Sequence, residues 1–182
     1  MSDIAAAVDV LQRGGILAHA TEGVWGLACD PHNAAAVQRL LKIKMRPEEK
    51  GLLLLGGSAA AFAPQLDALE RADRQSIEAT WPGHVTWILP DTEYPSWVSG
   101  GRKTVACRVP DHDQSRQLAE GMQRPIVSTS LNLAGEEPIR SYAEALAQFA
   151  QIVDLVLPGE IGLADGPSKI QQLQDTGIQS LR

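Results

Sequence analysis

The sequence lacks the features that would place a protein in a membrane or outside the cell. No apolar run approaches the roughly 20 residues that a helix needs to cross a bilayer. The start of the chain, Met1-Ser2-Asp3, has neither the basic segment nor the apolar core of an export signal. The only two cysteines, Cys29 and Cys107, lie in apolar surroundings without a partner motif, which predicts reduced, partly buried thiols. We therefore expect a cytoplasmic protein without membrane contact.

Short motifs that commonly mark nucleotide and acyl-transfer sites are also missing. There is no G-x-x-x-x-G-K-[ST] loop and no G-x-G-x-x-G opening a helix, so a nucleotide site would have to use side-chain cations. There is no G-x-S-x-G and no evident His/Asp pair, which argues against a serine nucleophile. Because the four histidines show no ligand spacing, the sequence assigns neither a metal site nor a catalytic base.

What is present is the composition of an ordinary globular protein with an uneven charge distribution. The 182 residues are 44% hydrophobic and 21% charged, which predicts a single domain over 1–182. The net charge of −6 argues against a protein that coats nucleic acid. Between Arg39 and Lys50, however, five basic and two acidic residues give a local net charge of +3. This cationic island indicates a bound anion, with a solvated helix face as the alternative.

The spacing of apolar residues predicts alternating helices and strands. We expect helices over 2–14, 33–44, 111–122 and 141–149, and a helical stretch that ends near 81–83. We expect strands over 16–20, 52–55, 85–89, 104–109, 125–128 and 152–157, and a loop over 21–31. This alternation predicts an α/β fold whose helices flank a largely central sheet, without fixing the strand order.

Local signals mark several ends of these helices. Ser2 and Asp111 are expected to cap helices, and Ser141 has capping-box spacing with Glu144. Pro47 is expected to prevent the second helix from continuing.

Two polar segments interrupt the apolar pattern. Lys44-Met45-Arg46-Pro47-Glu48-Glu49-Lys50-Gly51 ends a helix with three cations. Arginine forks and lysine charges suit phosphate oxygens, although a lysine at a helix C-terminus is also favoured by the helix dipole. Ser128-Thr129-Ser130-Leu131-Asn132 follows an apolar strand, where polar residues either line a cleft or cap a turn. Together the segments predict a site for a nucleotide and a small polar substrate.

Arg108 is a single cation in an otherwise apolar strand, Val105-Ala106-Cys107-Arg108-Val109. A charge that faces the interior must be paired. The partner can be a structural carboxylate or the carboxylate of a small bound amino acid, and the residues alone leave both open.

These segments resemble the motifs of the bacterial YrdC/Sua5 family, the threonylcarbamoyl-AMP synthases. The family is marked by K-x-R followed by S-x-N, which here are Lys44, Arg46, Ser130 and Asn132. Further matching blocks occur in family order along nearly the whole chain: Thr21-Glu22-Gly23-Val24-Trp25-Gly26, Trp81-Pro82-Gly83-His84-Val85-Thr86, Arg108-Val109-Pro110 and Pro167-Ser168.

The resemblance implies a twisted, open α/β sheet with a concave binding cleft. It implies a catalytic role for Lys44 and Arg46. The implied contacts with ATP come from Lys44, Arg46, Lys50, Thr86, Ser130 and Asn132. The implied threonine pocket is formed by Thr21, Arg108, Ser128 and Ser168.

The implied reaction converts L-threonine, bicarbonate and ATP, with Mg²⁺, into threonylcarbamoyl-AMP and pyrophosphate. A separate tRNA threonylcarbamoyl transferase complex would then use the product, and this chain would touch tRNA weakly at most. The alternatives are an RNA-binding or ribosome-assembly factor of the same fold, and a paralogue that acts on another carbamoyl-type substrate.

The chain departs from the family pattern at four positions. Ala20 and Leu131 replace the common Pro and Ala of two motifs, and Gly166 replaces an Asn before Pro167-Ser168. Gln171 stands where the family often has Arg, which leaves open what supplies that cation. The length resembles that of the short bacterial type, without the further C-terminal domain of longer Sua5 proteins.

Overall fold

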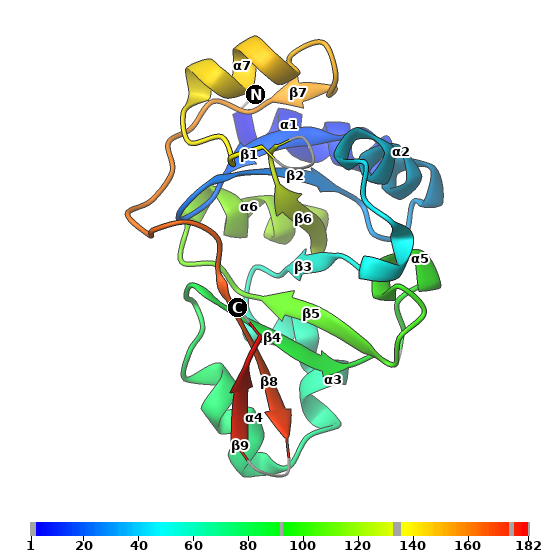
Figure 1. Cartoon of the computed structure of the whole chain (residues 1–182), viewed down its shortest axis with the longest axis vertical. Helices are drawn as coiled ribbons and strands as arrows, with labels where there is room; N and C mark the ends of the chain where they lie inside the picture. The colour runs from blue at the N-terminus through cyan, green and yellow to red at the C-terminus, as the bar shows by residue number, and fades with distance from the viewer. Residues whose placement is uncertain (1–2, 92, 133–135, 175–176, 182) are drawn as a thin grey trace.

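The computed structural model describes residues 3–91, 93–132, 136–174 and 177–181. Within these residues the chain forms a nine-stranded sheet in the order β7-β1-β2-β6-β3-β5-β4-β8-β9 (Figure 1). Its strands are β1 (Leu17–Ala20), β2 (Trp25–Cys29), β3 (Leu53–Leu55), β4 (Val85–Pro90), β5 (Thr104–Arg108), β6 (Ile126–Ser130), β7 (Leu155–Val156), β8 (Lys169–Gln174) and β9 (Gly177–Ser180). The predicted α/β fold with a central sheet is confirmed.

The sheet is mixed rather than parallel. The pairs β1–β7, β3–β5 and β4–β8 run parallel, and the other neighbouring pairs run antiparallel. Antiparallel β6 lies between β2 and β3, so its polar end is bordered by strands from two distant parts of the chain.

Helices cover the sheet and close its core. They are α1 (Asp3–Gln12), α2 (Ala34–Lys44), α3 (Ala63–Asp67), α4 (Arg71–Glu78), α5 (Ser96–Ser99), α6 (Asp113–Met122) and α7 (Tyr142–Phe149), with 3₁₀ turns η1 (Glu48–Lys50) and η2 (Ala59–Phe62). Leu11 of α1 and Leu118 of α6 pack with Leu17 and Ile126 of the sheet in one buried cluster. A larger cluster includes Leu40 of α2, and this burial of apolar surface supplies the main driving force for folding.

The predicted helix start near residue 33 and the predicted cap at Ser141 are confirmed, and the structure adds a side-chain cap at Asn33. Asn33 Oδ1 accepts a hydrogen bond from the backbone N–H of Ala36 at 3.0 Å and caps α2. Ser141 Oγ accepts from the backbone N–H of Glu144 at 3.2 Å, as the capping-box spacing predicts, and its hydroxyl also donates to the Glu144 carboxylate at 2.9 Å. Helix α2 ends through Met45, whose φ of 47° is left-handed, before the chain reaches Pro47.

The prediction that Asp111 caps a helix is wrong. The residue at the N-cap of α6 is His112, and no side chain caps that end. The backbone N–H of Asp111 instead donates to the carboxylate of Glu22 at 2.9 Å. The expected cap at Ser2 lies outside the described residues.

The predicted loop over 21–31 is also wrong in part, because it contains β2. This strand is fully buried between β1 and β6, so it shows no alternation of polar and apolar residues. Strands β8 and β9 were not predicted, and β7 covers only part of the expected 152–157. The expected free, buried thiols are confirmed for Cys29 and Cys107.

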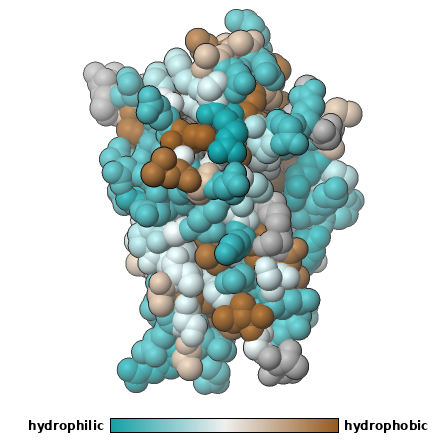
Figure 2. Space-filling view, turned by 60° about the vertical axis from the view of Figure 1, so that its left-hand side comes forward, coloured by the Kyte–Doolittle hydropathy of each residue, from teal (hydrophilic) through white to brown (hydrophobic). Residues whose placement is uncertain are grey.

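Apolar side chains on one face of the molecule lie in separate patches (Figure 2). Figure 2 shows one face on which hydrophobic residues form small groups among hydrophilic ones. Among the helices that the structure describes, none combines the length and hydropathy needed to cross a bilayer.

Candidate functional site

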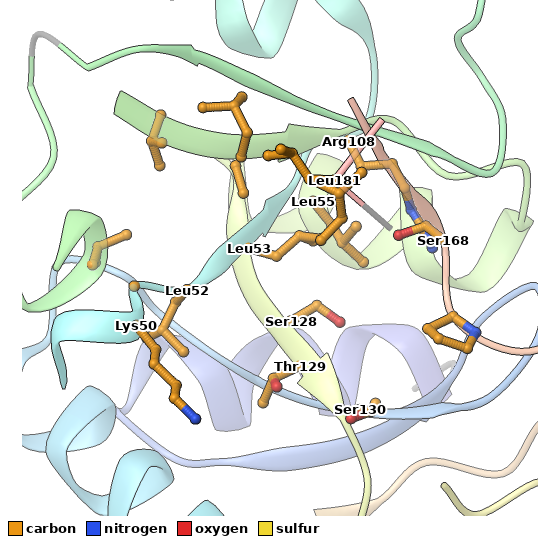
Figure 3. Close-up of a pocket in the computed structure, with 18 of the residues that line it drawn as sticks. Lys50, Leu52, Leu53, Leu55, Arg108, Ser128, Thr129, Ser130, Ser168 and Leu181 are labelled. Atoms are coloured by element: carbon orange, nitrogen blue, oxygen red, sulfur yellow. The ribbon is translucent and has the colours of Figure 1, made fainter. Parts of the chain in front are cut away.

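A cavity of about 540 Å³ opens beside the polar end of β6 (Figure 3). Figure 3 shows Lys50 and Arg108 on opposite sides of this cavity, with the serine and threonine side chains of β6 between them. Leu53, Leu55 and Leu181 add an apolar wall near Arg108. The cavity therefore has two separate cationic sides that share one row of hydroxyl groups.

One side is built around the turn η1, which two arginines hold. Arg46 donates to the backbone carbonyl of Gly51 at 2.9 and 3.1 Å and to that of Lys50 at 3.3 Å. Arg102 donates to the carbonyls of Lys50 and Glu49. Arg46, Lys50 and Arg102 all line the cavity. We call these three residues the cationic turn.

None of the described residues that line the cavity is acidic. Positive charges gathered at a concave surface of low polarisability attract anions more strongly than scattered surface charges do. The cationic turn is thus suited to phosphate groups, as the sequence predicts for Arg46 and Lys50.

Lys44 lies behind the lining and joins the two predicted motifs. Its ammonium donates to the backbone carbonyls of Ser130 at 2.6 Å and Asn132 at 2.7 Å, and to Asn132 Oδ1 at 2.5 Å. Ser130 Oγ also donates to Asn132 Oδ1, at 2.8 Å. Three acceptors thus match the three N–H groups of the ammonium. Burial, together with the charge of Arg46, lowers the pKa of Lys44 to about 8.

Ser168 reaches the cavity from the segment that precedes β8. Its hydroxyl lies 2.8 Å from that of Thr86, which is fully buried in β4. Thr21 follows the end of β1 and also lines the cavity. Its Oγ1 donates to the carbonyl of Val24 at 2.7 Å. Thr86 therefore supports Ser168, whereas Thr21 and Ser168 face the cavity themselves.

The second cationic side is the buried pair Arg108–Glu22. Arg108 Nη2 donates to Glu22 Oε2 at 2.5 Å, and both side chains are only 5–6% exposed. Arg108 Nη1 lies 3.3 Å from Nδ1 of His84, whose Nε2 lies 3.1 Å from the carbonyl of Gly166. Burial raises the pKa of Glu22, but His84 and Arg108 outweigh it, so that the pKa falls below its ordinary value. A structural carboxylate partner thus exists for Arg108, which also lines the cavity.

The predicted site residues divide into two layers. Those that line the cavity are Thr21, Arg46, Lys50, Arg108, Ser128, Ser130 and Ser168. Those that lie directly behind the lining, bonded to it or to its backbone, are Lys44, Thr86 and Asn132.

Sequence reasoning did not find Glu22, Arg102 or the apolar wall. Glu22 belongs to the matching block that begins at Thr21, and a lone acidic residue beside an apolar strand is the signal that would have matched it to Arg108. Arg102 gave no such signal because it lies 52 residues from its partner Lys50.

Gln171, which stands where the family often has Arg, pairs with Trp87 in the sheet. Its neighbour Gln172 lines the cavity.

The described residues hold no group of three or more His, Cys, Asp or Glu side chains that could bind a metal ion. The side-chain oxygens that line the cavity are neutral: the hydroxyl groups of serine and threonine residues and the amide of Gln172. Since Mg²⁺ is usually held by one or two carboxylates plus substrate phosphates, an ion here would depend mainly on the phosphates.

The sequence matches the family model Sua5/YciO/YrdC, described as telomere recombination, over residues 9–182. Two similar proteins are named threonylcarbamoyl-AMP synthase. The one from Xanthomonas euvesicatoria pv. vesicatoria is 44% identical over 179 residues, which are 97% of this chain and 96% of the relative. The one from Halorhodospira halophila is 43% identical over 162 residues, which are 88% and 85% of the two chains.

Solved structures show the same similarity. The P. abyssi Sua5 complexed with L-threonine has a TM-score of 0.91 at 27% identity, and the match covers 98% of this chain and 53% of that one. E. coli YciO has a TM-score of 0.84 at 25% identity and covers 98% and 87%. The chain thus spans about half the length of that Sua5 but most of the length of the bacterial relatives.

Proposed function

The chain belongs to the Sua5/YciO/YrdC family, and from this premise we propose that it is a threonylcarbamoyl-AMP synthase. It would use L-threonine, bicarbonate and ATP and release pyrophosphate. Because AMP is transferred to a carboxylate oxygen, the enzyme would be a nucleotidyltransferase. The names of the similar proteins and the threonine bound to a similar structure support this function over an RNA-binding or ribosome-assembly factor.

The observation that carries the proposal is the arrangement of the two cationic sides around one row of hydroxyl groups. The cationic turn can neutralise the phosphates of ATP through Arg46 and Lys50. On the other side, Arg108, Thr21, Ser128 and Ser168 offer the mixed donors and acceptors that a zwitterionic amino acid with a hydroxyl group requires. Ser130 lies between the two sides and can contact the nucleotide.

The proposed chemistry needs no protein nucleophile. The amine nitrogen of threonine forms a bond to the carbon of bicarbonate, and water leaves. An oxygen of the resulting carbamate then attacks the α-phosphorus of ATP, the bond from this phosphorus to the bridging oxygen breaks, and pyrophosphate leaves. Catalysis comes from holding the reactants together and from cations that neutralise the phosphate charge.

Lys44, Thr86 and Asn132 contribute from behind the lining. The three hydrogen bonds of Lys44 fix the end of β6, and with it the position of Ser130. A direct contact of Lys44 with ATP, which the family motifs imply, requires its ammonium to exchange one of these three acceptors for the nucleotide. The fully buried Thr86 would likewise have to turn from Ser168, whereas the half-buried Asn132 can reach a ligand with its amide.

We propose that Mg²⁺ arrives bound to ATP and lowers the charge of its phosphates. The hydroxyl groups of the cavity can complete its coordination, in keeping with the absence of acidic side chains from the described lining. The product would pass in the cytoplasm to a tRNA threonylcarbamoyl transferase complex. Direct contact with tRNA would be weak, because the chain carries a net charge of −6.

The test is to incubate the purified protein with Mg²⁺, ATP, L-threonine and bicarbonate and to measure pyrophosphate. We expect release that depends on all three substrates, and a product with the mass of threonylcarbamoyl-AMP. Release without threonine or bicarbonate would identify an ATP pyrophosphohydrolase, and no release beside tight tRNA binding would favour the RNA-binding factor.

A further inference from the structure

His19 lies behind the cavity, fully buried in β1, and its ring reaches across the neighbouring strand. The residue opposite it on β2 is Gly26, which has no side chain. A Cβ at Gly26 would lie 3.2 Å from Nε2 of His19 and 3.0 Å from Oγ of Ser128. Because this space is open, Nε2 comes within 3.2 Å of Ser128 Oγ on β6. The cavity-lining hydroxyl of Ser128 is thus backed by an imidazole.

The other ring nitrogen determines which tautomer is present. Nδ1 of His19 lies 3.4 Å from Oγ of Ser115 in α6. Ser115 Oγ lies 2.9 Å from the carbonyl of Ala20, which can only accept, and 3.3 Å from Nδ1 of His112. Donation of its one proton to Ala20, the shortest of these contacts, leaves Ser115 Oγ as an acceptor toward His19. With Ser115 as the acceptor, His19 would carry its proton on Nδ1, and the bare Nε2 would accept the hydroxyl proton of Ser128.

The ring stays neutral and cannot act as a base. Burial, and then the charge of His112, lower the pKa of His19 to about 3. A ring with so low a pKa does not remove a hydroxyl proton at neutral pH, so the Ser128–His19 contact does not create a nucleophile. Its effect is to orient the hydroxyl.

We propose that His19 is a positioning residue that fixes the hydroxyl of Ser128 as a hydrogen-bond acceptor toward the cavity, where it receives an N–H of the threonine amine. The proposal rests on the proposed function, which places threonine beside Ser128. With its proton held by Nε2, Ser128 Oγ presents only lone pairs to the cavity, and these suit an amine but repel a carboxylate. The carboxylate of threonine is thereby directed to Arg108, and the amine to Ser128.

The orientation of the amine matters for the reaction. The amine must present its nitrogen lone pair to the carbon of bicarbonate. An acceptor fixed on one side of the amine binds an N–H and leaves the lone pair to point elsewhere, whereas a rotating hydroxyl could donate to that lone pair and block it. His19 therefore acts on threonine through Ser128 and has no reason to affect ATP.

The kinetic test compares His19→Phe, Ser128→Ala and the double variant in the pyrophosphate assay. His19→Phe keeps a ring of similar size without nitrogen atoms. We expect it to raise the threonine KM about 3- to 10-fold, the effect of one neutral hydrogen bond, and to change the ATP KM less than about twofold. In the Ser128→Ala background His19→Phe should change the threonine KM less than about twofold, because the two residues act as one unit. Equal effects in both backgrounds, or parallel changes in both KM values, would overturn the proposal.

Two controls separate positioning from folding. His19→Gln can restore an acceptor near the Nε2 position and should recover part of the threonine KM, whereas a purely steric role predicts no advantage over Phe. His32→Gln changes an exposed histidine away from this cavity and should leave both KM values unchanged.

A measurement on the wild-type protein covers the cases in which variants do not fold or no pyrophosphate is formed. Long-range ¹⁵N–¹H correlation spectra of ¹⁵N-histidine-labelled protein distinguish protonated from bare ring nitrogens. We expect Nδ1 of His19 to be protonated and Nε2 to be bare at pH 7, and a protonated Nε2 would refute the proposal. A wild-type protein with this tautomer but without synthase activity would refute the proposed function. The orientation of the Ser128 hydroxyl by His19 would then be supported, but its role in binding threonine would be refuted.

Discussion

The two cationic sides of the cavity are built in different ways. Arg108 lies in a strand, nearly inaccessible to solvent, and is held by the equally buried carboxylate of Glu22. Arg46 lies where the chain leaves α2 and is held by the backbone carbonyls of Lys50 and Gly51, with Arg102 bonded to the same turn. A carboxylate cancels a charge, whereas a carbonyl orients a guanidinium and leaves its charge in place.

This difference supports the proposed assignment of the two substrates to the two sides. A phosphate chain carries several negative charges, and it is best neutralised where positive charges are gathered, at the cationic turn. A zwitterionic amino acid carries no net charge. It suits Arg108, because a pair with Glu22 can bind a carboxylate by geometry without a large excess of positive charge.

The largest effect is expected from Glu22→Ala, which removes the buried partner of Arg108. Breaking a buried ion pair leaves a charge in a nonpolar environment and typically costs about 3–5 kcal/mol of unfolding free energy. Urea unfolding monitored by circular dichroism measures it.

The double variant Glu22→Ala/Arg108→Met is the control, because it removes both charges and should recover much of the loss. A loss below about 1 kcal/mol in Glu22→Ala would show that the pair is not the main support of Arg108. It would contradict the view that a buried carboxylate holds this side of the cavity.

The next largest effect is expected from Arg46→Ala on nucleotide binding. Loss of a charged hydrogen bond to phosphate should weaken ATP binding by about 1.5–3 kcal/mol in calorimetry. Lys42→Ala removes the same charge from an exposed position of α2 outside the cavity and should bind ATP as the wild type does. Unchanged ATP affinity in a folded Arg46→Ala variant would remove the phosphate assignment.

How much of the fold and of the site the sequence could predict depends on how far apart along the chain the interacting residues lie. The start of α2 near Asn33, the cap at Ser141 and the end of α2 before Pro47 depend on residues within a few positions of one another, and their spacing was sufficient. Lys44, Arg46 and Ser130 could be predicted as site residues because their spacing forms a known motif.

Interactions between distant segments could not be predicted in the same way. Glu22 and Arg108 are 86 residues apart, and His19 and Ser128 are 109 apart. Strand β8, Lys169–Gln174, is largely polar and gains its structure from pairing with β4 and β9, so its own residues give little sign of a strand. Sequence placed Lys44 with the nucleotide, but only the fold shows its ammonium bonded to the end of β6.

The stability of the whole chain should depend on pH through the buried histidine next to Ser128 on the threonine side. The pKa of His19 is about 3 in the folded protein and 6.5 ordinarily, so the unfolded chain binds more protons between these values. Stability is therefore present above about pH 6.5 and is lost as the pH falls, by about 1.4 kcal/mol per pH unit well below 6.5.

Urea unfolding of wild type and His19→Phe between pH 6 and 4.5 measures this contribution, because the other titrating groups are common to both proteins. We expect the unfolding free energy of the wild type to fall more steeply with decreasing pH, by a slope that corresponds to about one additional proton bound on unfolding. Parallel curves would show that His19 is protonated in the folded state.

The smallest effect is expected from Arg102→Ala, which removes the outer arginine of the cationic turn. Arg102 is exposed and already bonded to the carbonyls of Lys50 and Glu49, so the variant should weaken ATP binding by only about 0.5–1.5 kcal/mol. Its neighbour Lys103 is exposed and does not line the cavity, and Lys103→Ala is the matched control. An equal loss in both variants would indicate general attraction of ATP rather than a contact.

The division of the cavity into a phosphate side and a threonine side is tested most directly by titrating ATP and L-threonine separately into Arg46→Ala and Ser168→Ala. We predict that Arg46→Ala weakens ATP binding and leaves threonine binding within about twofold of wild type, and that Ser168→Ala does the reverse. If each variant instead lowers the affinity for both ligands by the same factor, the two sides do not bind separate substrates, and the division of the cavity is contradicted.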